Sequence, residues 1–230
     1  DLKQELAEAF THIDANRYPN EQPNELRDAL AERDGVDPEG IIVGNGSNEL
    51  TYTFGTAFLD PGTPVVMPRP MFSLYEKVAR ICNADLTPVP PRDDLSFDAD
   101  AIERAVVDTG AVMTVLTTPN NPTGLAMTMD EIEQIVRAVE GIVVVDEAYV
   151  EFNPAGSATD LLETYPNVVI LRTLSKGMGL AGVRLGYMIA RPELAHEIMK
   201  SRLPFMVDRF SEKIALALIE REDLLSERVA

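Results

Sequence analysis

The sequence predicts an α/β domain built on a mostly parallel seven-stranded sheet that is flanked by helices. Short apolar, β-branched runs alternate along the chain with longer stretches of helical periodicity, which is the pattern of strand–helix–strand units. Several of these runs, such as residues 142–145, are apolar at every position. Strands with this composition are typically covered on both faces, as in a parallel sheet.

The individual elements follow from these two patterns. Seven β-rich runs are expected to form strands at residues 41–43, 64–67, 86–89, 112–116, 142–145, 168–171 and 185–189. Helical spacing is expected to give helices at residues 1–10, 24–33, 48–58, 72–82, 98–107, 129–139, 158–164, 192–200 and 209–221. Pro23 and Gly35 are suitable start and stop signals for the second helix.

The chain reads as one continuous domain over residues 1–230, since no repeat, low-complexity tract or Gly/Ser linker divides it. Its 45% hydrophobic and 25% charged residues are ordinary for a globular protein. No apolar run is long enough for a transmembrane helix. The single cysteine, Cys82, and a start without the layout of a signal peptide favour the cytoplasm.

The net charge of −18, from 38 acidic and 20 basic residues, limits the possible partners. A field of this sign repels phosphate backbones and anionic lipids. Nucleic acid and membranes are therefore not expected as partners. No cluster of Cys or His has the spacing of metal ligands, so no metal is expected either.

The first polar motif follows the strand at residues 41–43. Residues 44–49 read Gly-Asn-Gly-Ser-Asn-Glu and lead into a helix. Glycines let the backbone approach a ligand, and the amides at a helix N-terminus favour an anion. One interpretation is a phosphate site, and the alternative is a glycine turn followed by a Ser or Asn helix cap.

The second and third motifs follow the next two central strands. Residues 117–124 read Thr-Thr-Pro-Asn-Asn-Pro-Thr-Gly, a rigid loop that can direct an asparagine amide inward, although a plain turn is the alternative. Asp146 comes directly after four apolar residues, at the buried end of a strand. An unpaired carboxylate is costly there, so Asp146 is expected to have a cationic partner or, alternatively, to cap a helix.

The fourth motif spans residues 172–187, after the strand at residues 168–171. Lys176 stands among small and apolar residues and is a candidate amine nucleophile. Arg184 could grip a phosphate with two hydrogen bonds. A surface lysine and a structural arginine are the alternatives. In open parallel sheets ligands bind beyond the carboxyl ends of the strands, which is where all four motifs fall.

With these motifs in this order, the sequence resembles the fold-type I aminotransferases that depend on pyridoxal 5'-phosphate (PLP), most closely their histidinol-phosphate aminotransferase branch. The resemblance covers nearly the whole chain and is carried by residues 120–124, 146–152, 172–176 and 180–187, with weaker support from 17–19. It implies the fold of the PLP-binding large domain. No Gly-x-Gly-x-x-Gly motif follows the first strand, which argues against a nicotinamide-binding protein.

The resemblance also implies roles for individual residues. Lys176 holds the cofactor as a Schiff base and moves the proton between the substrate and the cofactor. Asp146 pairs with the pyridine nitrogen, and Asn121 and Tyr149 contact the ring oxygen. Phe72 stacks on the ring, where other members often have tyrosine. The residues implied to bind the phosphate are Gly46, Ser47, Asn48, Thr173, Ser175 and Arg184.

The implied reaction is transamination of histidinol phosphate with 2-oxoglutarate in histidine biosynthesis, giving imidazole-acetol phosphate and glutamate, by a homodimer. The amino donor stays open, because aromatic aminotransferases and threonine-phosphate decarboxylases share much of the pattern. Family members also have a preceding segment with a tyrosine and a C-terminal small domain with a substrate-binding arginine. We expect residues 192–230 to lead toward that small domain, and the sequence to be a partial or truncated one. A PLP-binding domain without turnover is therefore a further alternative.

Overall fold

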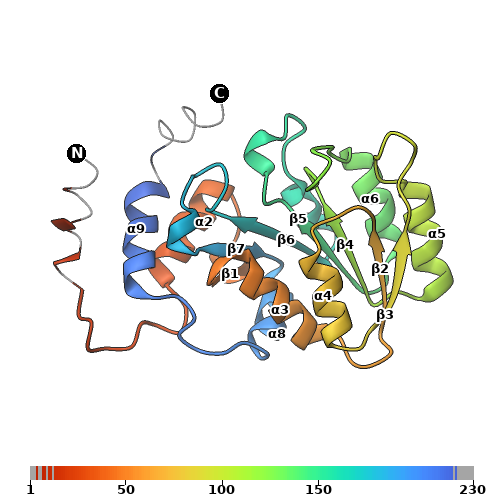
Figure 1. The fold of residues 1–230 in the computed structure, drawn as a ribbon. Helices are drawn as coiled ribbons and strands as arrows, with labels where there is room; N and C mark the ends of the chain where they lie inside the picture. Colours follow the sequence, from red (N-terminus) through yellow and green to blue (C-terminus); the bar gives the residue numbers. More distant parts are fainter. Residues whose placement is uncertain (1–3, 5–6, 9, 12, 220, 222–230) are drawn as a thin grey trace.

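The computed structural model describes residues 4, 7–8, 10–11, 13–219 and 221, so the ends of the expected domain and most of the expected first helix lie outside the described residues. One seven-stranded sheet runs through the molecule in the order β1-β7-β6-β5-β4-β2-β3 (Figure 1). Its strands are β1 (Ile41–Gly44), β2 (Pro64–Pro68), β3 (Asp85–Val89), β4 (Met113–Thr117), β5 (Ile142–Asp146), β6 (Val168–Thr173) and β7 (Gly186–Ile189). The predicted fold class and all seven predicted strands are confirmed.

The sheet is parallel except at β7. β2, β3, β4, β5 and β6 pair in parallel, whereas β7 is antiparallel to both of its neighbours, β6 and β1. The connection between β6 and β7 contains no α-helix, only the short 3₁₀-helix η4 (Ala181–Val183), so it returns the chain without a helical crossover. As a result, every strand except β7 ends at the same edge of the sheet.

Helices cover the sheet. They are α2 (Asn24–Asp34), α3 (Gly46–Phe58), α4 (Leu74–Ile81), α5 (Ala99–Thr109), α6 (Met129–Ala138), α7 (Leu161–Thr164), α8 (Pro192–Met199) and α9 (Arg209–Ile219). In Figure 1, α4 lies to one side of β2 and β3, and α5 lies to the other. This covering on both faces explains why β4 and β6 are buried at every position. In the part of the chain that the structure describes, no helix could cross a membrane.

Local sequence signals set several helix ends. α2 ends at Gly35, which adopts the left-handed conformation with φ of 67°. α6 begins with a capping box between Thr128 and Glu131. The predicted helix at residues 158–164 is instead a 3₁₀-helix, η3 (Ala158–Asp160), followed by the single turn α7. The helical segment ends at Thr164, as expected, because Tyr165 precedes Pro166 and the residue before a proline avoids helical geometry.

A buried ionic network joins four elements behind the edge at which the strands end. Arg172 in β6 lies 2.9 Å from Asp34 at the end of α2 and 2.9 Å from Glu147, the residue after β5. Tyr187 in β7 donates a hydrogen bond of 2.7 Å to Asp34. Ser157 also donates to Glu147, at 2.8 Å. The network fixes the ends of β5 and β6 relative to each other.

Arg172→Met should therefore destabilise the protein strongly. The side chains of Asp34 and Glu147 are 5% and 2% exposed, and removing their cation leaves buried carboxylates unpaired. The expected loss in the free energy of unfolding is about 3–5 kcal/mol. The control is Lys200→Met, which breaks the exposed pair with Glu197 and should cost less than about 1 kcal/mol. Urea denaturation measures both variants, and equal losses would show that the network does not stabilise the fold.

Candidate active site

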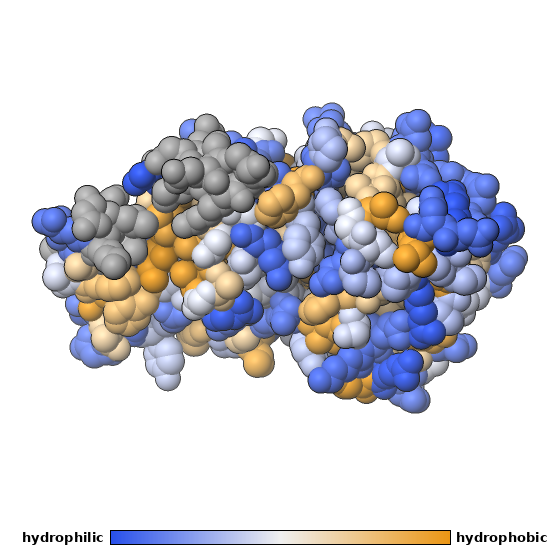
Figure 2. Space-filling view, turned by 45° about the horizontal axis from the view of Figure 1, so that its top comes forward, coloured by the Kyte–Doolittle hydropathy of each residue, from blue (hydrophilic) through white to orange (hydrophobic). Residues whose placement is uncertain are grey.

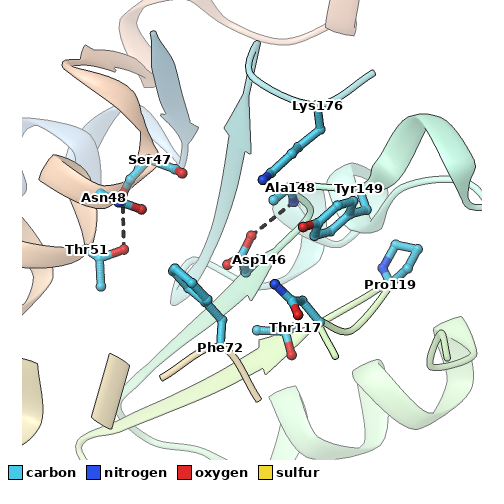
Figure 3. A pocket seen from close by; sticks show the side chains of 11 residues that line it. Ser47, Asn48, Thr51, Phe72, Thr117, Pro119, Asp146, Ala148, Tyr149 and Lys176 are labelled. Atoms are coloured by element: carbon cyan, nitrogen blue, oxygen red, sulfur yellow. Dashed lines mark hydrogen bonds between the residues drawn. The ribbon is translucent and has the colours of Figure 1, made fainter. Parts of the chain in front are cut away.

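A pocket lies at the edge where the strands end, and it brings together most of the residues that the sequence singled out. It holds about 480 Å³ of empty space, a volume that includes open solvent at its mouth. Its lining residues are Ser47, Asn48, Thr51, Phe72, Thr117, Pro119, Asn121, Asp146, Ala148, Tyr149 and Lys176 (Figure 3). Seven of these were predicted site residues. The other four predicted residues, Gly46, Thr173, Ser175 and Arg184, lie next to the pocket without lining it.

Asp146 is the last residue of β5 and is 8% exposed. Its Oδ2 accepts a hydrogen bond of 2.7 Å from the Tyr75 hydroxyl, and its Oδ1 accepts one of 2.9 Å from the Ala148 amide. Burial raises the pKa of Asp146, and the hydrogen bonds from Tyr75 and Ala148 oppose that rise. The charge of Glu147 raises the pKa further, whereas the charge of Lys176 lowers it.

Among the described side chains, Asp146 has neither of the two expected arrangements, a cation in contact or a helix that it caps. The expected cationic partner is not in contact, since Asp146 forms no ion pair with a described residue. Two neutral donors satisfy the carboxylate instead, and Lys176 acts on it only through its field. Asp146 also does not cap a helix, because the next helical segment, η2 (Val150–Phe152), has Tyr149 at its N-cap.

Lys176 lies in the turn that follows β6. The hydroxyl of Thr173 donates to the carbonyl of Leu185 and accepts from the amide of Ser175, which braces this turn. Figure 3 shows the Lys176 side chain extending into the pocket on the side of Asp146 and Tyr149. Its Nζ lies 5.3 Å from the centroid of the Tyr149 ring. Since the Thr173 hydroxyl already has two backbone partners, its predicted contact with a phosphate stays a prediction.

The start of α3 and Arg184 form a corner beside the pocket. Gly46 has φ of 76°, and a Cβ built there would lie 2.3 Å from Nη2 of Arg184. Likewise, a Cβ on Gly186 would lie 2.3 Å from the backbone nitrogen of Ser47. Glycine at both positions lets Arg184 and β7 approach the first amides of the helix. Free amides, a helix dipole and a guanidinium together favour an anion.

The alternative interpretation of residues 44–49 was a helix capped by a Ser or Asn side chain, and the structure contains no such cap at α3. The N-cap residue of α3 is Asn45, and its side chain makes no capping hydrogen bond. It donates instead to the carbonyl of Met206, at 3.3 Å. Nη1 of Arg184 also lies 3.4 Å from Oγ of Ser175, so the turn after β6 adjoins the same corner.

Arg202 and Glu49 support this corner from behind, through contacts that were not predicted from the sequence. Arg202, whose side chain is 1% exposed, donates to Glu49 at 2.7 Å and to the carbonyl of Val43 at 2.8 Å. Glu49 in turn accepts a hydrogen bond from the amide of Asn45. Residues 200–206 therefore hold the turn between β1 and α3 from behind. Because Arg202 and Glu49 are 153 positions apart in the sequence, no local sequence pattern predicts this pair.

Some residues in the pocket could have been found from spacing, whereas Tyr75, which lies behind it, could not. Thr51 lies four residues after Ser47 on α3, hence on the same helical face, and its hydroxyl donates to the Ser47 carbonyl at 3.0 Å. Thr117 ends β4 directly opposite Asp146 in the parallel register. Tyr75, by contrast, is brought to Asp146 by the tertiary fold across 71 positions.

Fold and pocket together define an α/β domain with a small-molecule site at the carboxyl ends of its strands, and comparison with known proteins identifies its family. The chain belongs to the aminotransferase class I and II family, whose model matches residues 1–230. It is 47% identical over 228 residues to the histidinol-phosphate aminotransferase of Chlorobaculum tepidum, covering 99% of this chain and 66% of that protein. It is 44% identical over 229 residues to that of Prosthecochloris aestuarii, covering 100% and 64%.

A solved structure supports the same family. The crystal structure of histidinol-phosphate aminotransferase from Sinorhizobium meliloti in complex with PLP matches with a TM-score of 0.92 at 28% identity. The match covers 99% of this chain and 62% of that one. The chain thus spans a little less than two thirds of the length of these relatives.

The pKa of Asp146 predicts a pH dependence of stability in the cofactor-free protein. A raised folded pKa means that the folded state holds the proton more tightly than the unfolded state does. Ionisation of Asp146 therefore lowers the free energy of unfolding as the pH rises from the ordinary carboxyl pKa through the raised pKa of the folded state. We expect Asp146→Asn to gain stability relative to the wild type as the pH rises through that interval.

The control for this experiment is Asp94→Asn. Ser96 donates side-chain and backbone hydrogen bonds to Asp94 and lowers its pKa. Its carboxylate contributes stability above the ordinary pKa, and that contribution is lost as the pH falls through the lowered pKa. Asp94→Asn should therefore lose stability relative to the wild type as the pH rises. Denaturation curves at several pH values measure both trends, and a parallel trend for the two variants would contradict the burial argument.

Proposed function

We propose that the protein is a PLP-dependent aminotransferase whose cofactor occupies this pocket. The observation that carries the proposal is the arrangement of three groups around one cavity: the buried carboxylate of Asp146, the amine of Lys176 and the anion-binding corner at Gly46 and Arg184. PLP has a basic ring nitrogen, an aldehyde and a phosphate, which match these groups one by one. The family and the PLP complex of the Sinorhizobium meliloti relative support the proposal.

Each residue has a task that follows from its position. Asp146 would hold a proton on the ring nitrogen, because a buried carboxylate with a raised pKa gains from a cation placed against it. Asn121 and Tyr149, from the loops after β4 and β5, would donate hydrogen bonds to the ring oxygen. Phe72 is 37% exposed and would offer its face to the ring.

The remaining groups bind the phosphate and move the proton. The amides of Ser47 and Asn48 would bind the phosphate with Arg184 and Ser175. When bound, the cofactor supplies the electron sink that makes a substrate Cα–H acidic. The Nζ of Lys176 would take that proton and return it as general base and acid.

We propose histidinol phosphate as the amino donor and 2-oxoglutarate as the acceptor, in histidine biosynthesis. The support is the identity of 47% and 44% to proteins named histidinol-phosphate aminotransferase. A solved L-threonine-O-3-phosphate decarboxylase from Porphyromonas gingivalis matches with a TM-score of 0.83 but only 23% identity. This match supports a shared fold and does not support a shared substrate. Aromatic amino acids and threonine phosphate are the competing substrates.

We also propose that the protein acts as a homodimer in the cytoplasm. Figure 2 shows apolar residues gathered on the side of the molecule near α9, whereas hydrophilic residues dominate the side of α5 and α6. Large apolar side chains exposed in this part of the chain include Leu203 at 72% and Tyr18 at 79%, and the Tyr18 ring stacks on Phe205. An exposed apolar patch of this kind is typical of a protein interface. The single cysteine fits a reducing compartment.

Incubation with PLP followed by borohydride reduction should fix the cofactor on Lys176. The chain has five lysines, at positions 3, 77, 176, 200 and 213, so peptide mapping can place the adduct without ambiguity. Lys176→Ala should abolish the adduct, whereas the exposed control Lys200→Ala should retain it in full. An adduct that maps to another lysine would overturn the proposed cofactor site.

The amino donor is tested by comparing kcat/KM for histidinol phosphate, phenylalanine and threonine phosphate at a fixed concentration of 2-oxoglutarate. The proposal expects histidinol phosphate to be preferred by at least about tenfold, which corresponds to about 1.4 kcal/mol in transition-state binding. A preference for either competitor refutes the proposed substrate. Cofactor binding without conversion of any of the three would favour a PLP-binding domain without turnover.

A further inference from the structure

A residue outside the predicted site lies directly behind Asp146. Tyr75 in α4 is 2% exposed, and its hydroxyl lies 2.7 Å from Oδ2 of Asp146. The other carboxylate oxygen, Oδ1, accepts from the Ala148 amide at 2.9 Å. The carboxylate is thus held at both oxygens, by donors from α4 and from the loop that follows β5.

The direction of the hydrogen bond from Tyr75 is fixed by chemistry. Burial raises the pKa of Tyr75 well above its usual range, and the neighbouring Asp146 charge raises it further. The phenol therefore remains a neutral donor over the working pH range, and Asp146 is the acceptor. A carboxylate offers about four lone-pair positions. Tyr75 and Ala148 use two of them, which leaves the others for a donor that enters the pocket.

We propose that Tyr75 is a positioning residue that holds Asp146 as an oriented carboxylate, ready to accept a hydrogen bond from the cofactor's ring nitrogen. In the loaded protein this inference rests on the proposed function. In the cofactor-free protein it stands on the contact between Tyr75 and Asp146 alone. Tyr75 does not line the pocket, so it acts on the cofactor only through Asp146.

The alternative is that Tyr75 is a core aromatic residue whose hydrogen bond to Asp146 has no effect on the properties of that carboxylate. The two readings differ in what happens to Asp146 when the hydroxyl is removed. The titratable groups that act on Asp146 are Tyr75 from α4, Glu147 beside it in the chain, and Lys176 from the turn after β6. Because the hydrogen bond from Tyr75 lowers the pKa of Asp146, its loss should let that pKa rise.

The test compares Tyr75→Phe with Tyr165→Phe. The control also removes a phenol that donates to a carboxylate at 2.7 Å, that of Glu133, but on the α6 side and outside the pocket. Phenylalanine keeps the ring, so the packing around each position is retained. In cofactor-free protein, ¹³C NMR of the carboxyl carbons follows the titration of Asp146, whose signal is assigned by its loss in Asp146→Asn.

The proposal expects the Asp146 titration to move to higher pH in Tyr75→Phe and to stay unchanged in Tyr165→Phe. In protein loaded with ¹⁵N-labelled PLP, the ring-nitrogen signal of Tyr75→Phe should shift toward the unprotonated form. Its kcat should fall by about tenfold or more, with little change in the KM for the amino donor, since a hydrogen bond to a charged group is lost.

The outcomes separate the two claims. An unchanged Asp146 titration in Tyr75→Phe overturns the role of Tyr75, whether or not PLP binds. If the wild type fails to hold PLP on Lys176 while the Asp146 titration still moves, the proposed function fails and the contact between Tyr75 and Asp146 stands. A Tyr75→Phe enzyme with a normal ring-nitrogen signal and a normal kcat would show that Tyr75 is a core aromatic only.

Discussion

The common direction of six strands is the constraint on which the site depends. Because β1 to β6 all end at one edge, the loops after β1, β2, β4, β5 and β6 meet there although they are distant in sequence. The loop after β6 leads directly into the antiparallel β7, so Lys176 and Arg184 reach this edge on the same connection. The pairing of the strands brings a helix N-terminus, a lysine turn and a buried carboxylate together. Side-chain contacts such as Arg172 with Glu147 and Arg202 with Glu49 hold them in place.

The adjacent acids Asp146 and Glu147 lie on opposite sides of the sheet and have different partners. The Glu147 amide donates to the Leu171 carbonyl and continues the ladder of β5, so the two side chains leave the backbone on opposite sides. Glu147 points into the ionic network and is neutralised by Arg172. Asp146 points to the pocket and receives only neutral donors. One acid is therefore paired within the fold, while its neighbour faces the pocket.

The sequence predicted the fold and most of the pocket because both depend on local patterns. Fully apolar runs such as residues 142–145 identify covered strands, and polar residues directly after such runs mark the edge where ligands bind. The placement of Ser47, Asp146 and Lys176 around one cavity followed from this rule. The family resemblance then supplied the chemical roles, which spacing alone left open between a ligand site and plain caps and turns.

The remaining features depend on contacts between distant parts of the chain. Tyr75 meets Asp146 across 71 positions, and Arg202 meets Glu49 across 153. No periodicity or motif connects such pairs, because they form only when α4 and residues 200–206 pack against the finished sheet. No described side chain forms an ion pair with Asp146, and the hydroxyl of Tyr75 donates to it instead. Burial was predicted correctly, but a neutral donor from another helix could not be seen in the sequence.

A crystal structure of the protein grown with PLP tests the central claim most directly. The account predicts continuous electron density from the Nζ of Lys176 to the cofactor, with the ring nitrogen facing Asp146. It also predicts the phosphate at the first amides of α3, within reach of Arg184. Density for PLP elsewhere, or a phosphate away from the start of α3, would contradict it.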